Sequence, residues 1–195
     1  MWKFEEKEKG PEVLLSWIRI LFSEHPDPET LVREVIQNSL DAKDNSSIQV
    51  YFIIGKKSFT EISSYFPNEL KERLKKSNSV ESDFNWPNEI YFLTIEDFGT
   101  TGLDGPTGEN GEIPEKGSSN YYDFWWRYGL SGKKETKGGR WGLGKITFPM
   151  VSRIKTFFGL TIRRDDNREL LMGEVIFKEP YTYNGRRYQP YGYFC

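Results

Sequence analysis

Three polar side chains in the first quarter of the sequence have the types and the spacing of a catalytic helix face. Glu34, Asn38 and Asp41 fall on one side of a helix, with Gln37 beside them. A carboxylate and a neutral amide oxygen one turn apart can activate a water molecule and ligate a hard cation that holds phosphates. An amphipathic surface helix whose polar face is simply hydrated is the alternative.

A second group of residues follows the apolar segment 90–96. Asp97 stands at the end of this segment, and Gly99 and Gly102 come after it. A carboxylate at a strand end can accept a hydrogen bond from an amino group, and neighbouring glycines let an aromatic ring approach the backbone. Because Asp and Gly are also common turn residues, an ordinary turn is the alternative here.

A third group is the glycine-rich segment 138–145, which reads Gly-Gly-Arg-Trp-Gly-Leu-Gly-Lys. It runs directly into a helix expected at 143–151, so backbone N–H groups and the helix dipole can bind an anion there. Lys145 adds a positive charge. A glycine-rich lid hinge is the alternative, and the two interpretations are compatible.

Two familiar nucleotide-binding signatures are excluded by their surroundings. Asp97-Phe98-Gly99 spells the magnesium-binding triplet of protein kinases, but the glycine-rich segment follows it instead of preceding it. His25 begins a His-Pro-Asp triplet, yet Val32 stands where a kinase catalytic loop requires asparagine. Residues 139–145 have the spacing of a P-loop, but Ile146 replaces the hydroxyl residue that holds magnesium.

The helices that must position these residues are predicted from apolar periodicity. Helices are expected over 12–22 and from 29 to about 42, with a short helix over 68–76. Asp27 and Pro28 are typical of an N-cap and a first helical turn. The buried side of the second helix is expected to consist of Leu31, Val32, Val35, Ile36 and Leu40.

Strands are predicted from runs of β-branched and aromatic residues. They are expected over 47–54 and over 90–96, the latter mostly buried. An antiparallel pair is expected over 153–163 and 169–177, joined around residues 165–167. This order of elements predicts an α+β two-layer sandwich.

Two longer segments interrupt this order. Residues 56–89 are polar and are expected to be an insertion within a single domain that spans 1–195. Residues 104–140 are rich in Gly, Glu, Lys and Asn, and irregular segments of this length are usually functional lids or disordered loops. The aromatic cluster 121–128 is expected to be the core of this lid, with a partner surface as the alternative.

The composition limits the class of protein. Apolar residues make up 36% of the sequence and aromatic residues 16%, enough for the core of one domain. The formal net charge of -2 does not indicate binding to nucleic acid or to an anionic membrane. Cys195 is the sole cysteine, and no apolar run approaches the roughly 20 residues of a membrane span. We therefore expect a soluble, cytoplasmic protein.

The three groups, taken in order, resemble the motifs of the GHKL ATPases, which include gyrase, the heat-shock chaperone, histidine kinases and mismatch-repair ATPases. They read Glu-x3-Asn-x2-Asp-Ala, then Asp-x-Gly-x2-Gly, then Gly-x2-Gly-x-Gly-Lys. Each motif is weak alone, but their order, with a lid between them, is specific and covers roughly residues 12–177. The resemblance implies the Bergerat fold, an α/β sandwich with helices on one face of a mixed sheet.

The resemblance also implies a role for each matching residue, with ATP and Mg²⁺ as the bound groups. Glu34 would be the general base that orients the attacking water, and Asn38 the magnesium ligand. Asp41 would support the helix or the nucleotide edge.

On the other two motifs, Asp97 would bind the adenine amino group, and Gly99 and Gly102 would let adenine lie close. Lys145 would contact phosphate. The phosphates would be cradled by Gly139, Gly142 and Gly144.

Two features depart from the family pattern. The first glycine motif is one residue longer, with Thr100-Thr101 inside it. The late Gly-Thr pair, whose threonine helps to hold adenine through water, is missing. Gly173-Glu174 lies on a suitable strand, but Glu174 has no hydroxyl. Thr161 is a speculative substitute for the missing threonine.

We expect an ATP-hydrolysing module whose lid closure drives dimerisation or rearrangement, with slow turnover in isolation. It would be the N-terminal part of a longer protein and would form an ATP-dependent homodimer or bind a partner protein. The sequence does not indicate binding to nucleic acid or to a membrane. The alternative is a nucleotide-sensing interaction module that binds ATP with negligible hydrolysis. A scaffold domain without nucleotide binding is the third interpretation.

Overall fold

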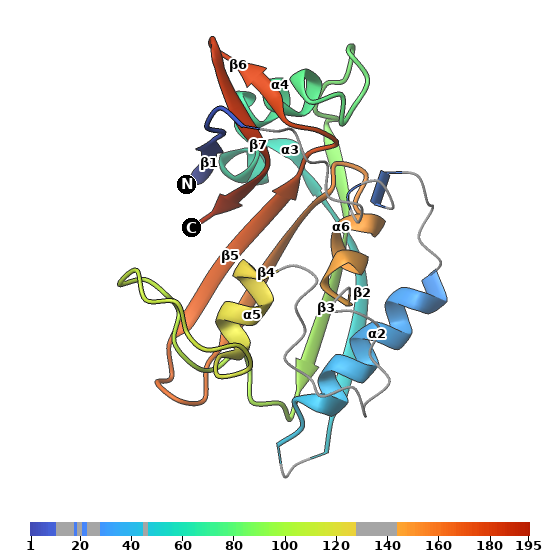
Figure 1. Ribbon diagram of the computed structural model, residues 1–195. Helices are drawn as coiled ribbons and strands as arrows, with labels where there is room; N and C mark the ends of the chain where they lie inside the picture. Colours follow the sequence, from blue (N-terminus) through green and yellow to red (C-terminus); the bar gives the residue numbers. More distant parts are fainter. Residues whose placement is uncertain (11–17, 19–20, 23–27, 45–46, 128–143) are drawn as a thin grey trace.

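The computed structural model describes residues 1–10, 18, 21–22, 28–44, 47–127 and 144–195 (Figure 1). The described elements belong to the α+β class, as expected. The helices, with 3-10 turns labelled η, are α2 (Pro28–Asp41), α3 (Phe59–Ile62), η1 (Ser63–Tyr65), α4 (Asn68–Lys76), α5 (Asn120–Trp126), η2 (Gly144–Ile146) and α6 (Thr147–Val151). The strands are β1 (Trp2–Glu6), β2 (Gln49–Ser58), β3 (Glu89–Phe98), β4 (Thr156–Ile162), β5 (Glu169–Ile176), β6 (Tyr181–Tyr183) and β7 (Arg186–Phe194).

The described strands form two antiparallel sheets instead of the single mixed sheet that the resemblance implies. The larger sheet has the order β1-β7-β5-β4, and β6 also pairs with β7. β2 and β3 form a sheet of their own, with an unbroken register from Gln49 opposite Phe98 to Ser58 opposite Glu89. The Leu103 N–H, in the loop after β3, donates a hydrogen bond to the Thr161 hydroxyl on β4, and no ladder joins β3 to β4 in the described part.

Strand β5 is buried on both faces, because successive side chains of a strand point to opposite sides of its sheet. On one side, Met172 packs against α5 and Ile176 packs against Ile146 of η2. On the other side, Val175 packs against Leu74 of α4. Figure 1 shows α5 in front of β4 and β5, and α4 beside β6. Helices therefore cover both faces of the larger sheet, which corrects the expectation of helices on one face.

Helix α4 lies inside the segment 56–89, which the sequence identifies as a polar insertion. Its bounds are those predicted. Leu70 and Leu74 have no exposed surface and pack with Val175 and Phe177. The segment therefore contributes to the main core instead of lying outside it.

Arg73 of α4 is a buried charged residue whose polar atoms are paired, so the helix can pack in the core. Its guanidinium donates a hydrogen bond of 3.0 Å to the Tyr181 hydroxyl and is paired with Glu69 at 2.8 Å. Cation–π contacts add to these bonds. The guanidinium carbon of Arg73 lies 4.0 Å from the ring centre of Phe4, 4.3 Å from that of Tyr183 and 4.2 Å from that of Tyr188.

The C-terminal hairpin was not anticipated from strand composition, whereas the antiparallel pair β4 and β5 confirms the prediction. Asn184 and Gly185 join β6 to β7 with φ angles of 49° and 77°. Positive φ at both central residues is the requirement of a type I′ turn, for which Asn-Gly is the preferred pair. This dipeptide between two tyrosine-rich segments is therefore a hairpin signal.

The expected burial of the segment 90–96 is wrong. β3 has nearly the predicted bounds, but Tyr91, Phe92 and Leu93 are 71%, 38% and 41% exposed. The cause is that β2 and β3 stand apart from the larger sheet, so the described elements do not cover both faces of this hairpin.

The helix predicted over 12–22 lies mostly outside the described residues, as does the N-cap residue Asp27. Ile18, Leu21 and Phe22 are described as helical. Ile18 and Leu21 are fully buried and pack against Ile146 of η2.

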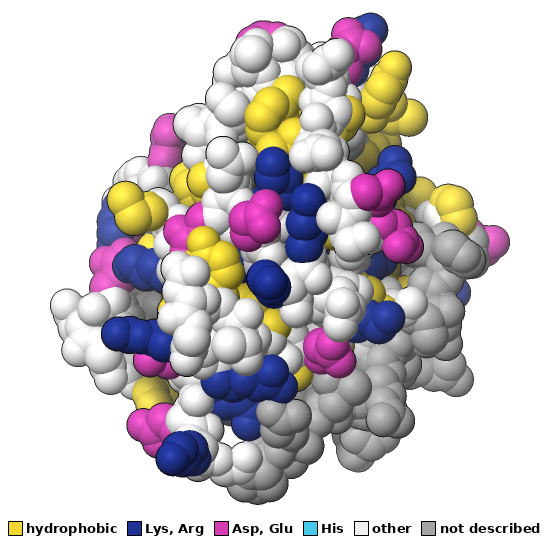
Figure 2. Space-filling model, turned by 90° about the horizontal axis from the view of Figure 1, so that it is seen from above, with side chains coloured by type: hydrophobic (Ala, Val, Ile, Leu, Met, Phe, Trp, Pro, Cys, Tyr) yellow, Lys and Arg dark blue, Asp and Glu magenta, His cyan; other side chains and the backbone are white. Residues whose placement is uncertain are grey.

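Basic and acidic side chains are interspersed over the described surface seen in Figure 2, with one compact basic group in the lower middle of the view. Hydrophobic side chains are scattered between them. This face therefore carries no extended surface of one charge sign. Among the described helices, none has the length and apolar character needed to cross a membrane.

Replacing Leu74 by alanine should lower the free energy of unfolding by about 2–5 kcal/mol, because loss of this buried side chain leaves a cavity. Leu160→Ala is the matched control, because Leu160 on β4 is 66% exposed. Its effect should stay within about 0.5 kcal/mol. Both values are measured by chemical denaturation, and equal losses would contradict the burial of α4.

Candidate functional site

A side-chain hydrogen bond joins the polar helix α2 to the end of β3. The Ser39 hydroxyl lies 3.0 Å from Asp97 Oδ2 and 3.1 Å from the Val35 carbonyl oxygen. A hydroxyl has one proton to donate, and an ionised carboxylate is the stronger acceptor of the two. Ser39 is 3% exposed, so this bond ties Asp97 to the buried side of the helix.

Backbone hydrogen bonds extend this connection beyond the end of α2. The Thr101 N–H donates to the Ala42 carbonyl at 3.0 Å, and the Asp44 N–H donates to the Gly99 carbonyl at 2.9 Å. The glycine loop after β3 is therefore fixed to the residues that follow α2. Two of the three sequence motifs thus meet in the structure, although they are far apart in the chain.

Gly102 occupies a position that only glycine fits. Its φ is 71°, and a Cβ there would lie 2.3 Å from the Ile162 carbonyl oxygen. The same Cβ would lie 3.0 Å from Thr161 Oγ1. Thr161 is 8% exposed and accepts a hydrogen bond of 2.8 Å from the Leu103 N–H. The structure therefore brings Thr161 directly to the glycine loop. Gly99 also has a positive φ, 79°.

The polar face of α2 borders its buried face. Glu34 is half-buried, whereas Asn38 and Asp41 are exposed, and Gln37 donates a hydrogen bond of 2.8 Å to Asp41. The buried residues of α2 are Leu31, Val35 and Ser39. The expectation that three further apolar residues of α2 would be buried is wrong. The exposed residues are Val32, Ile36 and Leu40.

The third motif is described only at its end. Gly139 and Gly142 lie outside the described residues, and Gly144 begins η2. Both η2 and α6 contact α2, so the end of the glycine-rich segment lies beside the helix that carries Glu34 and Asn38.

Lys145 points into the interior. Its Nζ lies 2.9 Å from Oε2 of Glu174 on β5 and donates a hydrogen bond of 3.2 Å to the Trp125 carbonyl. Burial lowers the pKa of the Lys145 ammonium well below its usual range and raises the pKa of the Glu174 carboxyl well above its own. The resemblance assigned this lysine to phosphate, but here its charge is directed at β5.

The first part of the expected lid, residues 104–127, packs on the larger sheet. Tyr121 and Trp125 of α5 are buried against Met172, and the Trp125 ring stacks on Phe157 with ring centres 5.6 Å apart. This burial favours a core role over a partner surface for the described part of the aromatic cluster, and that core is shared with the larger sheet. The rest of the lid, 128–140, lies outside the described residues.

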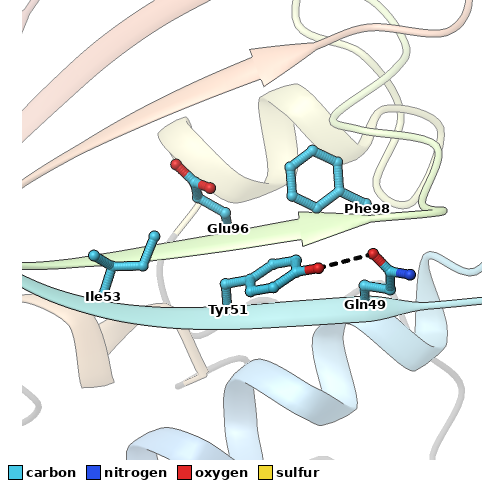
Figure 3. Close-up of a pocket in the computed structure, with 5 residues that line it drawn as sticks. All are labelled: Gln49, Tyr51, Ile53, Glu96 and Phe98. Atoms are coloured by element: carbon cyan, nitrogen blue, oxygen red, sulfur yellow. Dashed lines mark hydrogen bonds between the residues drawn. The ribbon is translucent and has the colours of Figure 1, made fainter.

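A pocket of about 330 Å³ lies on the face of the β2–β3 hairpin that carries Glu96 and Phe98 (Figure 3). Glu96 and Phe98 of β3 rise toward it, and the Tyr51 hydroxyl donates a hydrogen bond of 3.0 Å to Gln49. Because side chains alternate along a strand, Asp97 points away from this pocket. The pocket is therefore separate from the residues that the three motifs bring together.

Sequence reasoning missed two residues of this arrangement. Ser39 carries a signal, because it is a polar residue four positions after Val35 on an apolar stripe. Glu174 carries another, because it is a charge in the middle of an apolar strand. In the described ranges, no group of three or more His, Cys, Asp or Glu side chains could hold a metal ion.

Comparison with known proteins does not assign this chain: no protein-family model, no curated protein and no solved structure matches it. The function is therefore inferred from the residues and their geometry.

Gly102→Ala should destabilise the protein more than Gly111→Ala. Both positions have similar positive φ angles, 71° and 77°, so both variants carry the backbone strain of about 1–3 kcal/mol. A Cβ at Gly111 meets no atom within 4 Å, whereas one at Gly102 meets backbone at 2.3 Å. The extra loss should be about 1–3 kcal/mol in chemical denaturation. Equal losses would contradict the close packing of the loop on β4.

Proposed function

We propose that this chain is an ATP-binding, Mg²⁺-dependent ATP-hydrolysing module of the GHKL type. The observation that supports this most is the hydrogen bond from Ser39 to Asp97. It sets the carboxylate at the end of β3 against the helix that carries Glu34 and Asn38. These residues come from two motifs that were identified separately in the sequence.

The adenine would lie at the glycine loop. An ionised carboxylate offers about four acceptor sites, so Asp97 can receive both the Ser39 hydroxyl and an adenine amino group. Gly99 and Gly102, which have no side chains, lead the chain from this carboxylate to β4. Thr161 supplies a hydroxyl beside the loop and is our candidate for the threonine that the sequence otherwise lacks.

The residues present fit a magnesium–phosphate group. Mg²⁺ usually takes one or two protein ligands and completes its shell with water and phosphate oxygens, so the amide oxygen of Asn38 suffices without an acidic cluster. Asn38 would hold the ion, and Gly144 at the start of η2, with Gly139 and Gly142, would hold the phosphates. Bound Mg²⁺ would neutralise charge that develops on the phosphates.

Glu34 would act as the general base. It lies one helical turn before Asn38 and is half-buried, so its carboxylate can accept a proton from a water held near the phosphates. Asp41 would support this helix face, where it already accepts a hydrogen bond from Gln37. Closure of the lid would then drive rearrangement or dimerisation.

Asp97→Asn should weaken ATP binding strongly while leaving the fold intact, because the amide presents an N–H₂ group where the adenine amino group needs an acceptor. Calorimetric titration with ATP and Mg²⁺ measures the effect. Glu96→Gln is the matched control, since Glu96 is the neighbouring carboxylate on the opposite face of β3, and ATP affinity should not change. Unchanged affinity in a folded Asp97→Asn protein would refute the adenine assignment.

Glu34→Ala should retain ATP binding and lower the hydrolysis rate by roughly 10²–10⁴-fold, the range of a general base. Glu29→Ala, at the first turn of the same helix, should hydrolyse ATP at nearly the parental rate. Phosphate release by purified protein is the measurement. ATP binding without turnover in the parental protein would favour the nucleotide-sensing module, and parental turnover in Glu34→Ala would exclude Glu34 as the base.

A further inference from the structure

Lys145 and Glu174 form a buried ion pair at the junction of three elements. Lys145 belongs to η2, Glu174 lies on β5, and the carbonyl of Trp125 belongs to the last turn of α5. The Glu174 side chain is 0% exposed and that of Lys145 is 7% exposed. The Nζ–Oε2 distance is 2.9 Å, and neither oxygen of Glu174 has a hydrogen-bond partner among the described residues.

Such a pair strongly restricts where η2 can lie. If the ammonium moved away, the carboxylate would remain in the interior without compensation, which is strongly unfavourable. The neighbours of the pair include Tyr193 and the rings of Phe124 and Trp125, and none of these three is a cation. If Lys145 had to leave Glu174 to reach a phosphate, the free energy lost by separating the pair would weaken nucleotide binding.

We infer that Lys145 is a positioning residue that fixes the start of η2 against β5 and α5, and that it does not contact the phosphates. This inference rests on the proposed function. The pair would set the place of Gly144, and through it the backbone N–H groups at the end of the glycine-rich segment. Phosphate binding would then depend equally on both members of the pair.

The test uses Lys145→Met, Glu174→Met and the double variant, with Lys76→Met as the control for an exposed lysine. Affinities for ATP with Mg²⁺ and for adenosine are measured by calorimetry at a temperature where every variant is folded. Unfolding by denaturant is measured in parallel. Methionine keeps the side-chain volume and removes the charge.

If the inference holds, each single variant binds ATP about tenfold more weakly or worse and keeps its adenosine affinity, because only the phosphate cradle is displaced. Each single variant also shifts the folding equilibrium toward the unfolded state by about two orders of magnitude or more. The double variant should restore both properties, and Lys76→Met should change neither.

Three results would overturn the inference. Weak ATP binding in Lys145→Met and in the double variant, with normal binding in Glu174→Met, would make Lys145 a direct phosphate contact. Unchanged ATP affinity in all folded variants would reduce the pair to a structural role. Unchanged stability in both single variants would show that the pair does not form. If the parental protein binds no ATP, the proposed function fails, and the stability measurements still decide whether the pair exists.

Discussion

Burial of both faces of β5 is the constraint from which most of the structure follows. A strand with Met172 and Ile176 on one side and Val175 on the other must be covered twice. On one side this requires α5 and η2, and on the other it requires α4, which comes from a segment that is mostly polar in sequence. The same burial gives Glu174 no access to water, so its charge needs a partner from the covering layer, and Lys145 of η2 provides it.

The β2–β3 hairpin obeys a different rule, because it lies outside that sheet. Its large apolar side chains remain partly exposed, and side-chain and loop hydrogen bonds take the place of a ladder in joining it to its neighbours. Ser39 holds Asp97 on one side, and Thr161 holds the loop after β3 on the other. The candidate adenine site is therefore built from local hydrogen bonds between separate elements.

Local patterns in the sequence predicted α2, α4, β3 and the β4–β5 pair, because helix periodicity and strand composition are properties of neighbouring residues. They also placed Glu34 and Asn38 on one helix face. The sequence did not predict what covers an apolar face, since that depends on contacts such as Ser39 with Asp97, which are 58 positions apart. This is why β3 was expected to be buried and Lys145 was expected to face phosphate.

The two halves of the candidate site differ in how firmly they are held. On the adenine side, Ser39 is bonded to Asp97 and the Leu103 N–H to Thr161, by hydrogen bonds of about 0.5–1.5 kcal/mol each, or somewhat more where a charge takes part. Asp97 itself remains open to water. On the phosphate side, separating Lys145 from Glu174 would leave charge in a fully buried position, at a cost of about 3–5 kcal/mol. Breaking either hydrogen bond of the adenine side therefore requires less free energy than separating Lys145 from Glu174.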